Sequence, residues 1–138
     1  MYRYVLGLSL ALGLSGCAGL SGQVDTAKAG KVVAKRAEAR MAALQDLDFK
    51  QAYAYMSPTY RQVKDLKRFR VEFGGAANIV SFKVLEPECE PEVCRVVVTR
   101  VVKIPMGGRR VGQFMDMETS IQQVWVNTDG NWWYSTSR

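Results

Sequence analysis

The apolar residues of this sequence change their spacing about halfway along the chain. From Thr26 they recur as they do on one face of an α-helix, and after Gly74-Gly75 they follow the two-residue alternation of β-strands. Helices followed by hairpin-linked strands predict an α+β fold, with N-terminal helices packed on one face of a curved antiparallel sheet. The long first helix is expected to bury one stripe of residues: Val33, Ala37, Met41, Leu44 and Leu47.

Two shorter helices are expected next. Asp48 offers an N-cap for the first of them, and Ser57-Pro58 ends it. The second runs from about Asp65 to Phe73, where Gly74-Gly75 stops it. The residues expected to face inward are Phe49, Ala52, Tyr53, Met56, Leu66, Phe69 and Phe73.

The second half predicts four strands, over residues 78–86, 93–104, 111–127 and 132–137. Residues 105–110 would join the second and third strands as a loose hairpin, and Asp129-Gly130 is a strong turn signal before the last strand. In that strand the adjacent Trp132 and Trp133 point in opposite directions, so one is expected in the core and one outside.

The N-terminus has the layout of a secretory signal peptide. A single Arg3 precedes an apolar run over residues 5–14, which is shorter than the roughly 20 residues of a membrane-spanning helix. The following Leu14-Ser15-Gly16-Cys17 resembles the lipobox of bacterial lipoproteins. The resemblance implies that residues 1–16 are removed and that Cys17 is diacylated and then N-acylated, which would anchor the chain in a membrane. The alternative is plain secretion with Cys17 unmodified.

The resulting organisation is a signal peptide (1–16), a lipidated tether (17–25) and a single α+β domain (26–138). Ala18 stands where an inner-membrane retention signal would place Asp, so the resemblance favours the outer membrane, facing the periplasm. The remaining Cys89 and Cys94 form an even pair suited to an oxidising compartment, and a structural disulfide is expected. The alternatives are a redox pair or a metal site completed by glutamates at positions 88, 90 or 92.

Charge and composition exclude several kinds of chemistry. The chain has no His, which excludes His-based triads, His-ligated zinc and imidazole bases. Its net charge is +6, but an exported lipoprotein is not expected to bind nucleic acid. The densest basic cluster would meet anionic lipid headgroups or remain a solvated helix face, and a basic pair lies at the expected hairpin tip. These residues are Arg61, Lys64, Lys67, Arg68 and Arg70, with Arg109-Arg110 at the tip.

One segment resembles a known family. Residues 42–53 lead into Tyr55-Met56-Ser57-Pro58-Thr59-Tyr60-Arg61, which is similar to the opening of nuclear transport factor 2-like proteins, especially small lipoproteins of that superfamily. The resemblance covers residues 28–137 in element order and the opening third in motif. It implies a cone whose curved sheet and helices enclose a pocket, and it allows a homodimer. Because members include isomerases, dehydratases, hydrolases and non-catalytic domains, the fold does not specify an activity.

The third expected strand carries the candidate catalytic groups. Asp116 and Glu118 share one face with Ser120 and Gln122, opposite a face of Met115, Met117, Thr119 and Ile121. Two arrangements are open. The carboxylates could line the pocket with the phenol of Tyr60, Tyr53 or Tyr55, or they could form a solvated stripe while the Met and Ile face is buried. The second is favoured because Met and Ile need burial.

These observations predict a lipid-anchored cell-envelope binding or scaffold domain that is non-catalytic and needs no cofactor or metal. Its expected partners are the membrane, through Cys17, and either an envelope protein or a small apolar ligand. The alternative is an isomerase-, dehydratase- or hydrolase-like enzyme with a carboxylate–tyrosine pocket built from Asp116, Glu118 and Tyr60.

Overall fold

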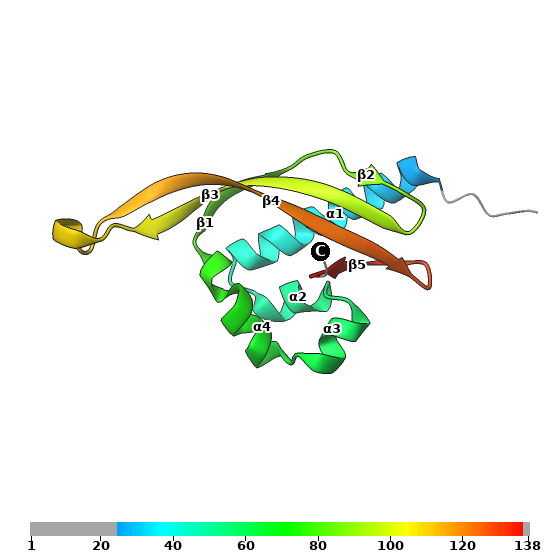
Figure 1. Ribbon diagram of the computed structural model, residues 1–138, viewed down its shortest axis with the longest axis horizontal. Coiled ribbons are helices and arrows are strands. Elements are labelled where there is room, and N and C mark those ends of the chain that lie inside the picture. Colours follow the sequence, from blue (N-terminus) through cyan, green and yellow to red (C-terminus); the bar gives the residue numbers. More distant parts are fainter. Residues whose placement is uncertain (1–24, 137–138) are drawn as a thin grey trace, which may run out of the picture.

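A layer of helices packs under one half of an antiparallel sheet in the computed structural model (Figure 1). The structure describes residues 25–136, without the side chains of Ala76 and Ala77. The helices are α1 (Thr26–Gln45), α2 (Phe49–Ala54), α3 (Pro58–Val63), α4 (Leu66–Phe73) and the 3-10 turn η1 (Gly74–Ala77). The strands are β1 (Ile79–Val84), β2 (Glu88–Cys89), β3 (Val93–Pro105), β4 (Phe114–Thr128) and β5 (Asn131–Ser135), with the 3-10 turn η2 (Gly108–Arg110) between β3 and β4. The predicted signal peptide, Cys17 and most of the tether lie outside the described residues.

Side-chain caps start each α-helix. The carboxylates of Asp25, Asp48 and Asp65 and the hydroxyl of Ser57 accept hydrogen bonds from backbone N–H groups of the first turns. Each such cap contributes about 1 kcal/mol to helix stability. The predicted cap at Asp48 and the predicted helix ending at Phe73 are confirmed. The helix α3 was missed, because Pro58 not only ends the preceding segment but also occupies the first turn of a new helix, a position that suits its fixed φ.

The predicted buried stripe of the long helix is correct except at its last residue. Val33, Ala37, Met41 and Leu44 are buried, whereas Leu47 is 55% exposed. Leu47 lies beyond the end of α1 and has a φ of 62°, in the left-handed region. The chain must reverse between α1 and the cap of α2, and this turn takes Leu47 out of the helical stripe.

All strand pairs in the sheet are antiparallel, in the order β1-β3-β4-β5, with β2 paired to the start of β3. The predicted turn at Asp129-Gly130 is confirmed, with φ values of 53° and 79° that suit a tight hairpin. The strand predicted from residue 111 begins at Phe114, because η2 and a further turn use the residues before it. Backbone hydrogen bonds link Tyr134 in β5 to Tyr55 and Ser57 of the helical layer.

The core lies between α1 and the half of the sheet that the helices cover. Val33 and Met41 of α1 and Val96, Val98 and Trp125 of the sheet are fully buried there. Gln123 is also fully buried; its Oε1 accepts a hydrogen bond from Trp125 Nε1 at 3.1 Å. The fold is therefore α+β, as predicted, with helices on one face of a five-stranded sheet that does not close.

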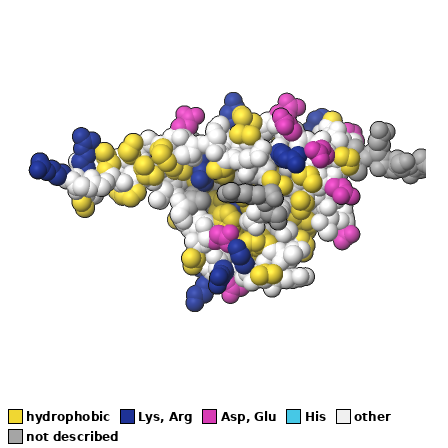
Figure 2. All heavy atoms as spheres, viewed as in Figure 1, with side chains coloured by type: hydrophobic (Ala, Val, Ile, Leu, Met, Phe, Trp, Pro, Cys, Tyr) yellow, Lys and Arg dark blue, Asp and Glu magenta, His cyan; other side chains and the backbone are white. Residues whose placement is uncertain are grey.

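Beyond the helices, β3 and β4 continue as a long hairpin, here called the hairpin arm (residues 103–117), which projects from the molecule in Figure 1. Met115 and Met117 are 45% and 39% exposed. The prediction that they are buried is wrong, because the helical layer does not extend under this part of the sheet. Hydrophobic side chains run along the arm, and basic side chains mark its tip (Figure 2).

Candidate functional site

A cleft of about 520 Å³ opens between the helices and the sheet. Its walls come from α1, α4, β3, β4 and β5, so it is formed by the tertiary fold rather than by a local motif. Its volume falls in the range of small-molecule sites. The lining residues are Arg40, Met41, Leu44, Glu72, Phe73, Gly75, Arg100, Ile121, Gln122, Val124, Tyr134, Ser135 and Thr136.

Arg40 is the unusual residue of this cleft. It lies on the buried stripe of α1, is 2% exposed, and stacks its guanidinium 3.8 Å from the ring centroid of Tyr134 and 5.2 Å from that of Phe73. Within residues 25–136, its buried Nε and Nη2 atoms have no hydrogen-bond partner, and no carboxylate forms an ion pair with it. Burial lowers the pKa of Arg40 to about 10, so it stays charged at neutral pH.

A second arginine borders the same cleft. Arg100 on β3 is half-buried, and its Nε donates a hydrogen bond to Thr119 Oγ1 at 3.3 Å. Its positive charge is close enough to contribute to the lowered pKa of Arg40, after the larger effect of burial. Two arginines, Arg40 and Arg100, therefore line the same cleft.

The carboxylate that lines the cleft already has other partners. Glu72 Oε2 accepts a hydrogen bond from Lys64 Nζ at 2.7 Å and from the Tyr60 hydroxyl at 2.9 Å. The bond from Lys64 is the main cause of the lowered pKa of Glu72, whereas burial, followed by the bond to Glu72, raises the pKa of Tyr60. Since Glu72 is neutralised by Lys64, the charges of Arg40 and Arg100 leave the cleft positive.

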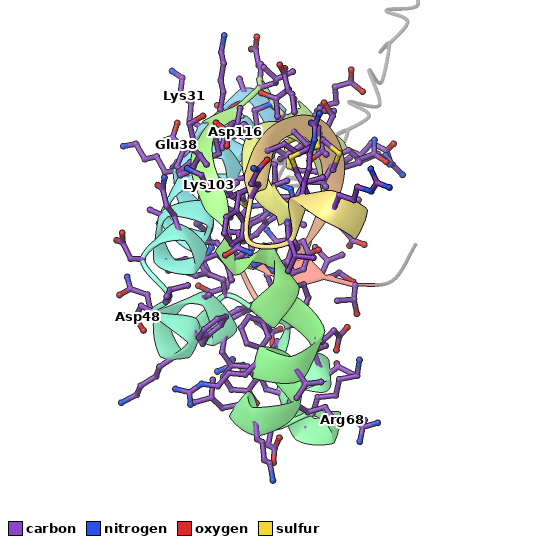
Figure 3. The ribbon with its side chains drawn as sticks, turned by 90° about the vertical axis from the view of Figure 1, so that its left-hand side faces the viewer. Lys31, Glu38, Asp48, Arg68, Lys103 and Asp116 are labelled. Carbon is purple, nitrogen blue, oxygen red and sulfur yellow. A yellow bond between two sulfur atoms is a disulfide. The ribbon has the colours of Figure 1, made fainter. Side chains whose placement is uncertain are left out.

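The predicted catalytic candidates are not brought together. Asp116 lies on the hairpin arm, where its carboxylate is 3.9 Å from Lys103 Nζ and both side chains are 55% exposed (Figure 3). Glu118 is also exposed, as the solvated-stripe alternative predicted. Tyr60 lies in the helical layer with its hydroxyl on Glu72, and the hydroxyl of Tyr53 donates to the backbone oxygen of Lys64 at 2.7 Å.

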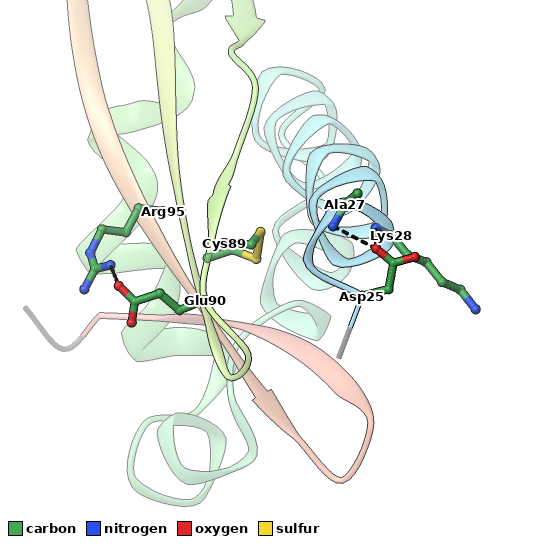
Figure 4. Close-up of a disulfide and its surroundings, with 7 residues drawn as sticks. Asp25, Ala27, Lys28, Cys89, Glu90 and Arg95 are labelled. Carbon is green, nitrogen blue, oxygen red and sulfur yellow. Dashed lines mark hydrogen bonds and ion pairs between the residues drawn. A yellow bond between two sulfur atoms is a disulfide. The ribbon is translucent and has the colours of Figure 1, made fainter. Parts of the chain in front are cut away.

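The predicted disulfide is confirmed. Cys89 and Cys94 are bonded across the β2–β3 pair, with their Cα atoms 4.1 Å apart (Figure 4). Cys94 is fully buried, and α1 packs against the bond at Gly30. Nearby, Glu90 pairs with Arg95 at 3.0 Å. Within the described residues no group of three or more His, Cys, Asp or Glu side chains could hold a metal ion.

The basic cluster of the helical layer is exposed except at Lys64, which is half-buried. Arg68 points away from the helices (Figure 3), and Arg61 lies 5.1 Å from the ring centroid of Trp133. Trp132 is buried and Trp133 is half-buried, as expected of one inward and one outward ring. Within residues 25–136 no helix has the length and apolar character that crossing a membrane requires.

The sequence interpretation missed the three charged residues of the cleft. A signal existed for Arg40, which falls seven residues after Val33 and next to Met41 on the apolar stripe of α1. A similar signal existed for Arg100, which shares the alternation of the buried Val96, Val98 and Val102. Glu72 carried no such signal, because α4 brings it to the cleft only through the tertiary packing.

Comparison with known proteins supports the fold and leaves the activity open. No protein-family model matches the chain, and no curated protein matches it. The solution structure of RPA3114, a SEC-C motif containing protein from Rhodopseudomonas palustris, is similar, with a TM-score of 0.52 and 18% sequence identity. The match covers 70% of this chain and 69% of that one. At this identity the likeness shows the fold alone, an α+β domain with N-terminal helices on an antiparallel sheet.

Proposed function

We propose that this chain is a non-catalytic binding domain of the bacterial cell envelope that holds a small, largely apolar ligand in the cleft between its helices and its sheet. The observation that carries the proposal is a cleft of ligand size that combines an apolar wall with polar and charged groups. Met41, Leu44, Phe73 and Ile121 supply apolar walls, and the buried guanidinium of Arg40 supplies one strongly directional group. We further propose that the architecture is of the nuclear transport factor 2-like type, a proposal supported by the resemblance of residues 42–61 and by the order of helices and strands.

The placement of the acidic residues favours binding over catalysis. General acid–base chemistry requires a carboxylate and a proton donor within reach of one reacting atom. Asp116 and Glu118 are exposed to solvent, whereas Tyr60 is buried against Glu72. The carboxylate–tyrosine pocket of the enzyme alternative is therefore not assembled from these residues.

A copurification experiment tests ligand binding. The protein is purified from the envelope of its native host without denaturation, and native mass spectrometry measures any small molecule bound to it. Ile121→Trp fills the cleft, and Val97→Trp is the matched control on the opposite face of the sheet. Thermal melting checks that both variants are folded. A small molecule that accompanies the wild type and Val97→Trp but not Ile121→Trp supports the proposal. A wild-type protein free of any such molecule contradicts it.

The location is a second part of the proposal and has its own test. We expect the mature chain to begin at a triacylated Cys17 and to reside at the outer membrane, facing the periplasm. Cys17→Ser should abolish lipidation and leave uncleaved precursor, because the lipoprotein signal peptidase acts only after the lipid is attached. Mass spectrometry of the mature N-terminus measures this directly. An unmodified Cys17, or another first residue, would refute the anchor, and material found only in the inner membrane would refute the sorting.

A further inference from the structure

We infer that the ligand of the cleft carries a carboxylate, which binds between Arg40 and Arg100, with an apolar body against the remaining walls. This inference rests on the proposed function and names the chemical class of its ligand. It starts from an imbalance in the structure: the cleft contains more desolvated positive charge than its own residues neutralise.

Arg40 shows the imbalance most clearly. A buried charge costs several kcal/mol of desolvation unless it is paired and hydrogen-bonded. Stacking on Tyr134 and Phe73 offsets part of this cost, but stacking provides no acceptor for the N–H groups. Among the described residues, Nε and Nη2 have no hydrogen-bond partner. Because Arg40 lines the cleft, an anion that enters the cleft can supply the missing acceptors after a small side-chain adjustment.

The geometry of the unpartnered atoms favours a carboxylate. Nε and Nη2 lie on the same edge of the planar guanidinium, so their N–H groups form a parallel pair that matches the two oxygens of one carboxylate. Arg100 adds a second positive charge at the same cleft. Within residues 25–136, Glu72 forms its ion pair with Lys64 and none with either arginine, and its Oε2 also accepts a hydrogen bond from Tyr60.

The other lining residues determine the rest of the ligand. Met41, Leu44, Phe73 and Ile121 form an apolar wall, and the remaining polar lining residues beside it, such as Gln122 and Thr136, carry no charge. A cleft of about 520 Å³ accommodates a small molecule rather than a protein segment with its own fold. The ligand class is therefore a small amphipathic monocarboxylic acid.

The test compares three probes with the same six-carbon chain: hexanoate, hexanamide and hexyl phosphate. The mature lipidated protein is held in lipid nanodiscs, and calorimetric titration measures the dissociation constants against empty nanodiscs. We expect hexanoate to bind at least about tenfold more tightly than hexanamide, which corresponds to the loss of one charge-assisted hydrogen-bonded pair. Hexyl phosphate is expected to bind more weakly than hexanoate.

The variants separate the role of Arg40 from general effects of charge. Arg40→Met keeps an unbranched apolar side chain and removes the buried charge, so it should fold and should lose the preference for hexanoate over hexanamide. Arg40→Lys should restore part of that preference. Arg36→Met is the matched control, because Arg36 also stacks on aromatic rings from α1 but does not line the cleft. It should bind hexanoate as the wild type does, and Arg100→Gln should weaken hexanoate binding several-fold.

Failure of the inference can be told apart from failure of the proposed function. Equal binding of hexanoate and hexanamide, abolished by Ile121→Trp, would keep the cleft as a binding site and overturn the carboxylate. Tighter binding of hexyl phosphate would overturn the choice of carboxylate over phosphate. If hexanoate does not bind, or binds to Arg40→Met as it does to the wild type, the inference is wrong. The proposed function is then tested separately, by whether a small molecule copurifies with the wild type and Val97→Trp but not with Ile121→Trp.

Discussion

The covered half of the sheet and the hairpin arm are built from the same two strands, yet they differ in what surrounds them. In the covered half, the face of β4 that turns toward the helices carries Gln123 and Trp125, both fully buried. In the arm, the same face of the same strand carries Met115 and Met117, which are 45% and 39% exposed. Strand alternation therefore determines which face a side chain occupies, and the reach of the helical layer determines whether that face is buried.

Substitution of Trp125 tests the comparison with the largest expected effect. Trp125→Ala removes a fully buried ring that contacts Tyr55 and Tyr134 and leaves the Oε1 of buried Gln123 without its donor. We expect a loss of about 3–5 kcal/mol in the free energy of unfolding. Urea denaturation measures it, with Phe114→Ala on the arm as the control. Similar losses in the two variants would show that the arm is part of the core.

The disulfide joins β2 to β3 in the covered half of the sheet. Its removal should have a smaller effect on stability. Replacing both Cys89 and Cys94 by Ala opens a short loop, which lowers the free energy of unfolding by about 2 kcal/mol on the chain-entropy model. The measurement is urea denaturation of the wild type and the double variant, each with and without reductant. Reductant should destabilise the wild type alone. A double variant as stable as the wild type would contradict a stabilising role for the bond.

Acid sensitivity should arise from the helical layer rather than from the arm. The folded-state pKa of Glu72 is lowered, mainly by its hydrogen bond from Lys64, so its contribution to stability is present above the ordinary Glu pKa of about 4.3 and is lost as the pH falls below it. Because the pair is about one-third exposed, we expect less than about 1 kcal/mol. Glu72→Gln should flatten the decline in stability between neutral and acidic pH.

The control for this experiment is the ion pair of the arm. Asp116 and Lys103 are 3.9 Å apart and largely exposed, so Asp116→Asn should change stability by only a few tenths of a kcal/mol at neutral pH. Thermal melting of both variants over a pH series gives the comparison. A steeper acid decline in Glu72→Gln than in the wild type would show that the sign assigned to Glu72 is wrong.

The smallest effect is expected from the apolar residues of the arm. Phe114→Ser and Met117→Ser should each change the free energy of unfolding by less than about 0.5 kcal/mol, because both side chains already contact solvent. The melting temperature is measured over a hundredfold range of protein concentration. If the melting temperature of the wild type falls on dilution while those of the Ser variants do not, a second copy of the chain covers the arm. The arm would then not be an uncovered part of the sheet.

Apart from α3 and β2, the sequence predicted the elements in their order because their signals are local. The caps at Asp48 and Asp65 and the turn at Asp129-Gly130 act on the residues beside them. The exposure of Met115 and Met117 depends instead on where α1 and α4 end in space, and no pattern within β4 records this. The cleft is unpredictable for the same reason, since Arg40, Glu72 and Arg100 come from three elements.

The uninterrupted course of β4 has a consequence for the motions of the molecule. Its 15 residues run from the exposed Phe114 to the turn before β5, and they pair with β3 over the whole of that strand. Backbone N–H groups of the arm are held by the ladder alone, so they can exchange with solvent through local fraying. Those beside Gln123 and Trp125 are released only when the packed core opens. We therefore expect two characteristic opening times within this one strand, with the boundary between them near Thr119 and Arg100, at the wall of the cleft.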